Sequence, residues 1–203
     1  MELIIRKTNN TEFFTTENLT RETFWNLYQS GCTEHFMIYN FRKSKAWVKQ
    51  LDIIALINDK IVGHIISTKA KVIDENNTEH EVLHVGPFSV EAELQSKGIG
   101  TQLLNHSILE AKKLGFKGMI LFGNPDYYQR FGFKNAKEFN ITTKEGMNFD
   151  PFMALELQEN GLAAIQGKFY LDESAEINEQ ELTKYEEQFP AKEKGEPKIK
   201  INV

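Results

Sequence analysis

The sequence predicts a mixed α/β fold, in which helices flank a mixed β-sheet. Between Leu51 and Val90, runs of β type follow one another with short polar turns between them, as in an antiparallel meander. After Leu94, a stretch with helical periodicity precedes GMILF at 118–122, a wholly apolar run that is typical of a strand buried on both faces. A strand, a helix and a strand in this order favour a parallel pair with a right-handed crossover.

The first half of the chain is expected to contain strands and two helices. LIIR at 3–6 fits a first strand. Thr20 offers an N-cap for a first helix that stops at Gly31, and a second helix is expected around 36–41. The strands expected next are LDIIALI at 51–57, IVGHIISTKAKVI at 61–73 and HEVLHVGPFSV at 80–90, joined by a turn at 58–60 and a polar loop at 74–79.

The second half is expected to alternate helix and strand. An apolar helical face follows the sequence GIG and ends at Gly115, and GMILF is the next strand. Two further strands are expected near 138–142 and 152–158.

The composition changes near the C-terminus. From Asp172 to Glu187, seven acidic residues stand against the single base Lys184, with apolar residues at roughly helical spacing. We therefore predict a domain at 1–171 and an acidic, helical extension at 172–203, whose helix ends at Pro190. The alternatives for this extension are a wall over a binding site and a contact within a homodimer.

Composition and charge exclude several classes of partner. The chain has 203 residues, of which 40% are hydrophobic and 15 are Phe, which is enough for one sizeable core. A net charge of −5 without a long cluster of Lys and Arg argues against a nucleic-acid partner. Cys32 is the one cysteine, so no internal disulfide can form. The first apolar run is too short for a signal peptide and the longest are strand-sized, so we expect a soluble, cytoplasmic protein without a membrane partner.

The stretch LQSKGIGTQLL at 94–104 indicates an anion-binding helix start. A helix N-terminus presents unpaired N–H groups and a partial positive charge, and Gly98 and Gly100 let a phosphate approach the backbone. The side chains that can reach the same anion are Gln95, Lys97 and Thr101. The loop lacks the third glycine of GxGxxG and the GK[ST] ending of a P-loop, which disfavours a protein that binds dinucleotides or nucleoside triphosphates.

The strand before this loop is interrupted at Gly86-Pro87. A proline withholds one N–H from the sheet, so we expect a bulge that separates this strand from its neighbour. A bulged strand, an anion-binding loop and a crossover helix together indicate a site for an elongated, phosphate-bearing cofactor.

Two motifs carry a family resemblance. VEAELQSKGIGTQLL at 90–104 resembles the acyl-CoA signature of the GNAT acetyltransferase superfamily, V-x-P-x-x-Q-x-x-G-I-G-x-x-L-L, with Ala92 in place of the usual proline. NPDYYQRFGF at 124–133 resembles a later motif of that superfamily, which ends Tyr-x-x-x-Gly-Phe. Together with VGH at 62–64 and GPFSV at 86–90, they are similar to a small bacterial branch of predicted N-acetyltransferases, and the resemblance runs from about Leu51 to Leu157.

The resemblance implies a GNAT-like splayed mixed β-sheet flanked by helices, with acetyl-CoA bound as acetyl donor between the fourth and fifth strands. The backbone of Phe88, Ser89 and Val90 would then bind the pantetheine arm. The pyrophosphate would be held by the loop residues Gln95, Ser96, Lys97, Gly98, Ile99, Gly100 and Thr101. Asn124 and Tyr127 are further candidates for contact with acetyl-CoA, and no metal is implied.

The implied reaction is transfer of an acetyl group from acetyl-CoA to a primary amine of a small molecule or peptide, by direct attack in a ternary complex. Tyr128, at the tyrosine position of the later motif, is the candidate general acid, and its structural alternative is a core aromatic residue. His84 is the candidate base, because its ordinary pKa suits proton abstraction. Further candidates on the acceptor side are Glu34, His35, Glu91 and Glu93. The histidines show no metal-ligand spacing, so no metal site is expected.

Two other functions remain open at this stage. A non-catalytic acyl-CoA-binding sensor or regulator would keep the same fold without turnover. A nucleotide-binding protein would bind ATP or NAD, which the incomplete glycine motifs disfavour.

Overall fold

The structure, a computed structural model, describes residues 2–199. Within these residues the helices are α1 Phe13–Phe24, α2 Glu34–Phe41, α3 Ile99–Lys113, α4 Pro125–Tyr128 and α5 Glu179–Glu186. The strands are β1 Leu3–Lys7, β2 Ile53–Ile57, β3 Lys60–Ile73, β4 Glu79–Val90, β5 Gly118–Phe122, β6 Lys134–Asn135, β7 Ile141–Thr143, β8 Phe152–Glu156 and β9 Gly167–Tyr170.

The strands form a mixed sheet of order β1-β2-β3-β4-β5-β8-β6, with β9 next to β3 and β7. β1, β2 and β3 pair antiparallel, whereas β4 and β5 pair parallel across Leu83↔Met119 and His84↔Ile120. β5 and β8 pair antiparallel. The mixed α/β prediction and the parallel pair on either side of α3 are therefore confirmed.

The chain forms two compact units. The first contains the described residues up to Ile66, the segment Pro87–Leu104 and the described residues from Glu173 onwards. The second contains Ser67–Gly86 and Asn105–Asp172. β3, β4 and α3 contribute residues to both. The division at 171/172 drawn from composition stays a prediction.

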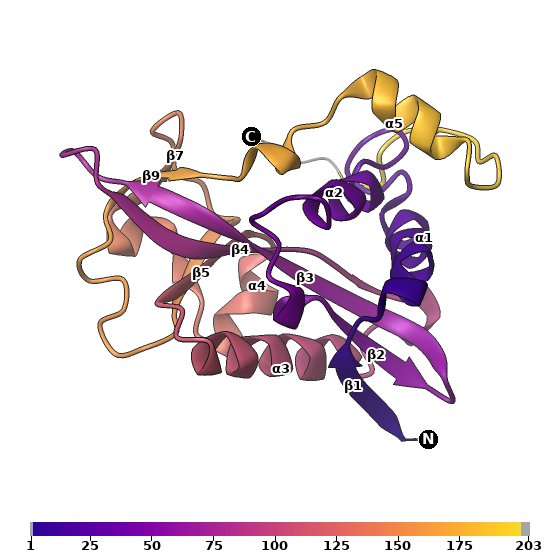
Figure 1. Cartoon of the computed structure of the whole chain (residues 1–203), viewed down its shortest axis with the longest axis horizontal. Coiled ribbons are helices and arrows are strands. Elements are labelled where there is room, and N and C mark those ends of the chain that lie inside the picture. Colours follow the sequence, from indigo (N-terminus) through magenta and orange to yellow (C-terminus); the bar gives the residue numbers. More distant parts are fainter. Residues whose placement is uncertain (1, 200–203) are drawn as a thin grey trace. The chain divides into compact units, whose positions relative to one another are not determined.

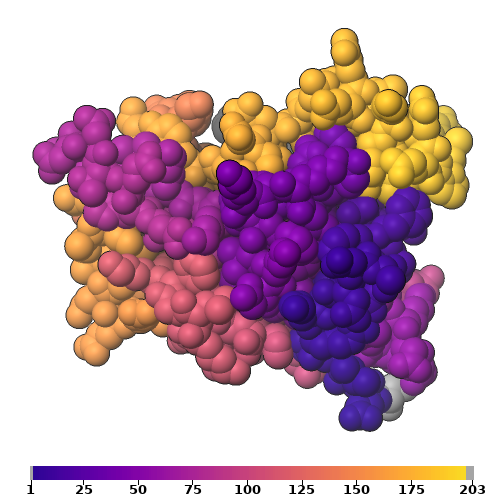
Figure 2. Space-filling view, in the orientation of Figure 1, coloured from indigo at the N-terminus to yellow at the C-terminus, as the bar shows by residue number. Residues whose placement is uncertain are grey.

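In the first unit, helices α1, α2 and α5 lie together beside β1–β3 (Figure 1). Ile38 and Phe41 of α2 pack on Ile66 of β3. The C-terminal segment, yellow in Figure 2, lies against the surface of the N-terminal helices. Its buried residues Leu182, Tyr185 and Phe189 form a cluster with Phe36. The C-terminal helix thus has an apolar face that is part of this unit's core.

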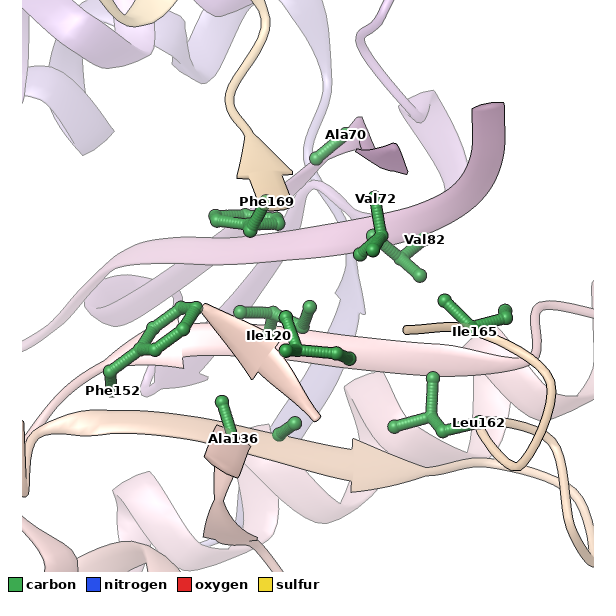
Figure 3. Packing of buried hydrophobic residues seen from close by; sticks show 11 residues of the cluster. Ala70, Val72, Val82, Ile120, Ala136, Phe152, Leu162, Ile165 and Phe169 are labelled. Atoms are coloured by element: carbon green, nitrogen blue, oxygen red, sulfur yellow. The ribbon is translucent and has the colours of Figure 1, made fainter. Parts of the chain in front are cut away.

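The second unit has its own core between its strands. Figure 3 shows side chains from β3, β4, β5, β8 and β9 converging on this core. The cluster consists of Ala70, Val72, Val82, Ile120, Ala136, Ile141, Phe152, Ala154, Leu162, Ile165 and Phe169. Ile120 is fully buried, as the all-apolar run GMILF predicted.

The predicted start of the first helix at Thr20 is wrong. α1 begins at Phe13, behind a turn in which Glu12 Oε2 accepts the Asn9 N–H at 2.8 Å, and Thr20 lies inside the helix. The expected end at Gly31 is also wrong. α1 stops at Phe24, because Asn26 takes a left-handed conformation with φ 55°. The buried residues of α1 are all polar, so apolar periodicity could not locate this helix.

Most of the other predicted elements lie close to their expected positions. The turn between β2 and β3 has positive φ at Asn58 and Asp59, and Gly115 follows α3 with φ 83°. The strand expected near 138–142 begins only at Ile141, because a 3₁₀ turn occupies Ala136–Phe139. α4, β6 and β9 were not predicted.

Candidate functional site

The backbone of β4 becomes irregular at Gly86-Pro87. Gly86 has φ 128°, a conformation that residues with side chains rarely adopt. Beyond it, Pro87 and Ser89 are buried, whereas Phe88 and Val90 are half-buried. The sequence therefore placed the irregularity of this strand correctly.

One hydrogen bond shows which edge of this segment each backbone N–H group faces. Glu91 N–H donates to Val62 O of β3 at 2.9 Å. Because N–H groups alternate from edge to edge along an extended strand, those of Phe88 and Val90 point to the edge opposite β3. Val90 O lies on that opposite edge and accepts the side-chain amide of Gln95 at 3.1 Å. The side chain of Gln95 thus connects the loop that follows β4 to the end of this strand by a hydrogen bond.

The loop from Gln95 to Gly98 is exposed and opens directly into α3. Ser96 and Gly98 have positive φ values of 60° and 85°. Gly98 O accepts the Gln102 N–H at 3.1 Å, so Gly98 occupies the N-cap position. The N–H groups of the first helical turn, which begins at Ile99, therefore have no acceptor within the helix. A Cβ on Gly98 would meet nothing within 4 Å, so the space beside its backbone is open.

Close packing fixes the start of this helix. A Cβ on Gly63 of β3 would lie 2.6 Å from Leu103 Cδ1 and 3.5 Å from Ile99 Cγ2. Only a glycine lets the first turns of α3 approach β3 so closely. The position of the loop before α3 thus depends on Gly63, the middle residue of the VGH run at 62–64.

A buried polar network supports the helices of the first unit. Arg42 donates to Glu17 Oε1 at 2.8 Å and to Asp52 Oδ2 at 2.9 Å. Asp52 Oδ1 lies 2.9 Å from His64 Nε2. Burial raises the pKa of Asp52, but hydrogen bonds from His64 and Arg42 outweigh it and lower that pKa. Burial also raises the pKa of Glu17, against the lowering effect of Tyr185 and Arg42.

In the second unit, the later motif forms a short helix after β5. Asn124 caps α4, because its side-chain oxygen accepts the Asp126 N–H at 3.0 Å. Tyr128 is half-buried at the end of α4. A Cβ on Gly123 would lie 2.2 Å from Tyr128 Cε2, so this glycine makes room for the tyrosine ring. Tyr127 packs at 80° to Tyr128 and against the guanidinium of Arg130.

His84 lies in the same unit, within the paired part of β4. Its side chain is buried, and burial lowers its pKa to about 4. It is therefore neutral near pH 7 and a weak proton acceptor. Its assignment as the base stays a prediction, which this burial weakens.

Three of the four remaining candidates, Glu34, His35 and Glu91, have structural partners, whereas Glu93 is exposed. Glu34 Oε2 accepts the Cys32 thiol at 3.2 Å, and burial raises the pKa of that thiol. Glu91 forms an ion pair with Lys60. His35 is buried with Nε2 2.7 Å from Glu186 Oε1, and burial lowers its pKa to about 4.

Across residues 2–199, no three His, Cys, Asp or Glu side chains are grouped to hold a metal ion. The helices of the same residues are too short or too polar to cross a membrane.

One contact near the loop was not predicted. Thr20 of α1 and Ser89 of β4 share a buried hydrogen bond of 2.8 Å between their hydroxyl groups. Their separation of 69 positions left no local signal in the sequence. The sequence instead predicts a helix N-cap at Thr20, which lies inside α1.

Comparison with known proteins gives consistent matches. The model of the Acetyltransferase (GNAT) family matches residues 21–133. An uncharacterized N-acetyltransferase, YhbS of Escherichia coli K12, is 18% identical over 108 residues, which span 53% of this chain and 63% of that protein.

Solved structures resemble the fold over most of the chain. The E. coli YhbS structure in complex with CoA has a TM-score of 0.76 and 16% identity, covering 86% of this chain and 92% of that one. A GNAT family acetyltransferase of Brucella melitensis in complex with acetyl-CoA has a TM-score of 0.71 and 22% identity, covering 86% and 99%. The E. coli ribosomal-protein-S18-alanine N-acetyltransferase has a TM-score of 0.55 and 17% identity, covering 78% and 96%.

Proposed function

Because the chain belongs to the acetyltransferase (GNAT) family, we propose that it transfers an acetyl group from acetyl-CoA to a primary amine. The observation that carries the proposal is the exposed loop from Gln95 to Gly98, which opens into the N-terminus of α3. Two structural relatives were solved with CoA or acetyl-CoA, which supports the same donor here.

The loop suits the diphosphate of acetyl-CoA. The first N–H groups of α3 and the positive end of its dipole provide an anion site, as at other helix N-termini. Ser96 and Gly98 bend the loop through two left-handed positions, and Lys97 adds a positive charge. Gln95 holds the loop on β4 through Val90 O, so its side chain acts by shaping the site.

The end of β4 suits the pantetheine arm and the thioester. The N–H groups of Phe88 and Val90 point away from β3, so an extended ligand can pair with the strand on that edge. One of these N–H groups would polarise the thioester carbonyl and stabilise the tetrahedral oxyanion.

In the proposed reaction, the neutral amine attacks the carbonyl carbon of the thioester, and the C–S bond of the tetrahedral intermediate breaks. Primary amines have a pKa near 10, so the acceptor must first lose a proton. His84 or water would take that proton, and Tyr128 would donate one to the departing CoA thiolate. Holding the two substrates together would supply much of the acceleration. Asn124 and Tyr127 are proposed to support acetyl-CoA binding near Tyr128.

The proposed acceptor is the amine of a small molecule or peptide. The ribosomal-protein enzyme of similar fold is named for a protein acceptor, whereas a further relative is an aminoglycoside 6′-N-acetyltransferase, with a TM-score of 0.55. One fold thus serves acceptors of different chemistry, so the acceptor depends on side chains outside the shared motifs.

The experiment is to incubate the protein with acetyl-CoA and a panel of diamines, polyamines, amino sugars and peptides, and to follow release of free thiol. Mass spectrometry identifies the acetylated product. Amine-dependent thiol release supports the proposal. Binding of acetyl-CoA without release for any amine would favour the alternative, a non-catalytic acyl-CoA sensor.

A further inference from the structure

The buried face of α1 is unusual, because all of its buried residues are polar. They are Thr16, Glu17, Thr20 and Arg21. Polar groups inside a protein need hydrogen-bond partners to offset the loss of water. Each of these side chains has such a partner, so α1 is held by directed bonds and therefore at a defined position and rotation.

These bonds tie α1 to two other segments of the first unit. Glu17 accepts the hydroxyl of Tyr185, and Arg21 donates to Glu186 at 2.8 Å, both on α5. Thr20, between them on the same face, bonds to Ser89 of β4. α1 therefore connects the C-terminal helix to the strand end at which the thioester is proposed to lie.

The Thr20–Ser89 bond fixes the side chain at the centre of that strand end. Thr20 is 0% and Ser89 1% exposed, so water cannot replace either hydroxyl as a partner. Side chains alternate along a strand, so Ser89 faces α1 while its neighbours Phe88 and Val90 face the other side. A shift or twist at Ser89 would therefore turn the N–H groups of both neighbours.

We propose that Thr20 and Ser89 form a positioning pair that holds the end of β4 in the orientation needed to polarise the thioester carbonyl. This inference rests on the proposed function and adds to it two side-chain hydroxyl groups to which the family resemblance assigns no role. The two hydroxyl groups do not touch the reacting atoms. They act through the backbone of Phe88 and Val90.

The test uses acetyl-CoA labelled with ¹³C at the thioester carbonyl and compares its NMR signal free and bound. Carbonyl polarisation by a backbone N–H moves the bound signal downfield. Thr20→Val removes the hydroxyl at nearly constant shape and should move the bound signal back toward the free position. Thr20→Ser keeps the hydroxyl and should reproduce the wild-type signal. Because no acceptor is needed, the readout does not depend on knowing the amine.

Two further variants separate positioning from general stability. Ser89→Ala should have the same effect as Thr20→Val, and the double variant should add little to either. Thr23→Val removes a hydroxyl from the same helix that donates only locally, to Leu19 O at 2.8 Å, and should leave the carbonyl signal in place. Once a reactive amine is known, kcat of Thr20→Val should fall at least tenfold, while Kd for CoA changes less than threefold because the loop is intact.

The outcomes distinguish the two proposals. If the wild-type protein does not bind acetyl-CoA, the proposed function fails and this inference fails with it. If it binds and the signal is the same in Thr20→Val as in wild type, only the positioning pair is overturned. If it binds but the wild-type signal is unshifted, polarisation of the carbonyl by β4 is overturned together with the positioning pair, while acetyl-CoA binding stands. Should Thr20→Val fail to fold, the bound carbonyl signal of Ser89→Ala is compared with that of wild type in its place.

Discussion

The hydroxyl of Tyr185 donates a 2.5 Å hydrogen bond to Glu17 Oε2, although 168 positions separate these residues. Both side chains are buried, and Arg42 donates to the other carboxylate oxygen of Glu17 at 2.8 Å. Burial, together with the charge of Glu17, raises the pKa of Tyr185, so this tyrosine stays a neutral donor. The C-terminal helix α5 therefore completes a polar network that stabilises the N-terminal helices.

Tyr185→Phe should lower the free energy of unfolding by about 1–3 kcal/mol, because it leaves one oxygen of a buried carboxylate without its donor. Urea denaturation measures the change. Tyr28→Phe, at an exposed position, is the control and should stay within about 0.5 kcal/mol of wild type. Equal stabilities for the two variants would contradict a supporting role for the network.

Gly98→Val should weaken CoA binding at least tenfold. A β-branched residue at φ 85° is strained, and its side chain would occupy the open space beside the loop. Gly146→Val is the matched control, since Gly146 also has φ 85° and open space around its Cα but lies in another loop. Calorimetric titration with CoA compares them. If Gly146→Val weakened binding equally, general strain and not the loop would explain the effect.

Tyr128→Phe should lower kcat by roughly 10²-fold if Tyr128 donates the proton to the thiolate. Kd for CoA should change little, because the loop that binds the diphosphate is intact. Tyr170→Phe, in β9 of the same unit, is the control. Unchanged kcat in Tyr128→Phe would assign this residue a packing role beside Gly123.

Stability should fall as the pH decreases from about 6.5 to 4. Burial lowers the pKa of His35 from 6.5 to about 4, so in this range the unfolded chain binds a proton that the folded chain does not. The contribution lost at pH 4 is of the order of 3 kcal/mol. Urea denaturation at several pH values should show a flatter profile for His35→Gln than for His106→Gln. Parallel profiles would show that His35 is not the group responsible.

The sequence predicted those elements whose signals are local. The Asn58-Asp59 turn, the glycine at 86 and the GIG helix start all depend on residues whose conformational preferences act within a few positions. α1 was misplaced because its buried face, including Glu17 and Arg21, is polar, so it lacks the apolar periodicity on which such predictions depend.

The parts of the candidate site that were missed depend on distant contacts. Thr20 meets Ser89, and Gly63 meets Leu103, only after the chain has folded. Asn124, predicted as a contact for acetyl-CoA, caps α4 through a local hydrogen bond from the Asp126 N–H. Such contacts between distant residues cannot be predicted from a single sequence, whereas the loop before α3 can be predicted from its own residues.

The most direct test of acetyl-CoA binding is a thermal-shift series with acetyl-CoA, CoA, ATP and NAD at matched concentrations near a millimolar. A ligand at a hundred times its Kd adds about 2.7 kcal/mol to native-state stability, which raises the Tm of a chain of this size by roughly 5–10 °C. We expect this rise with acetyl-CoA and CoA only. No rise with either, or an equal rise with ATP and NAD, would contradict the proposed acetyl-CoA site.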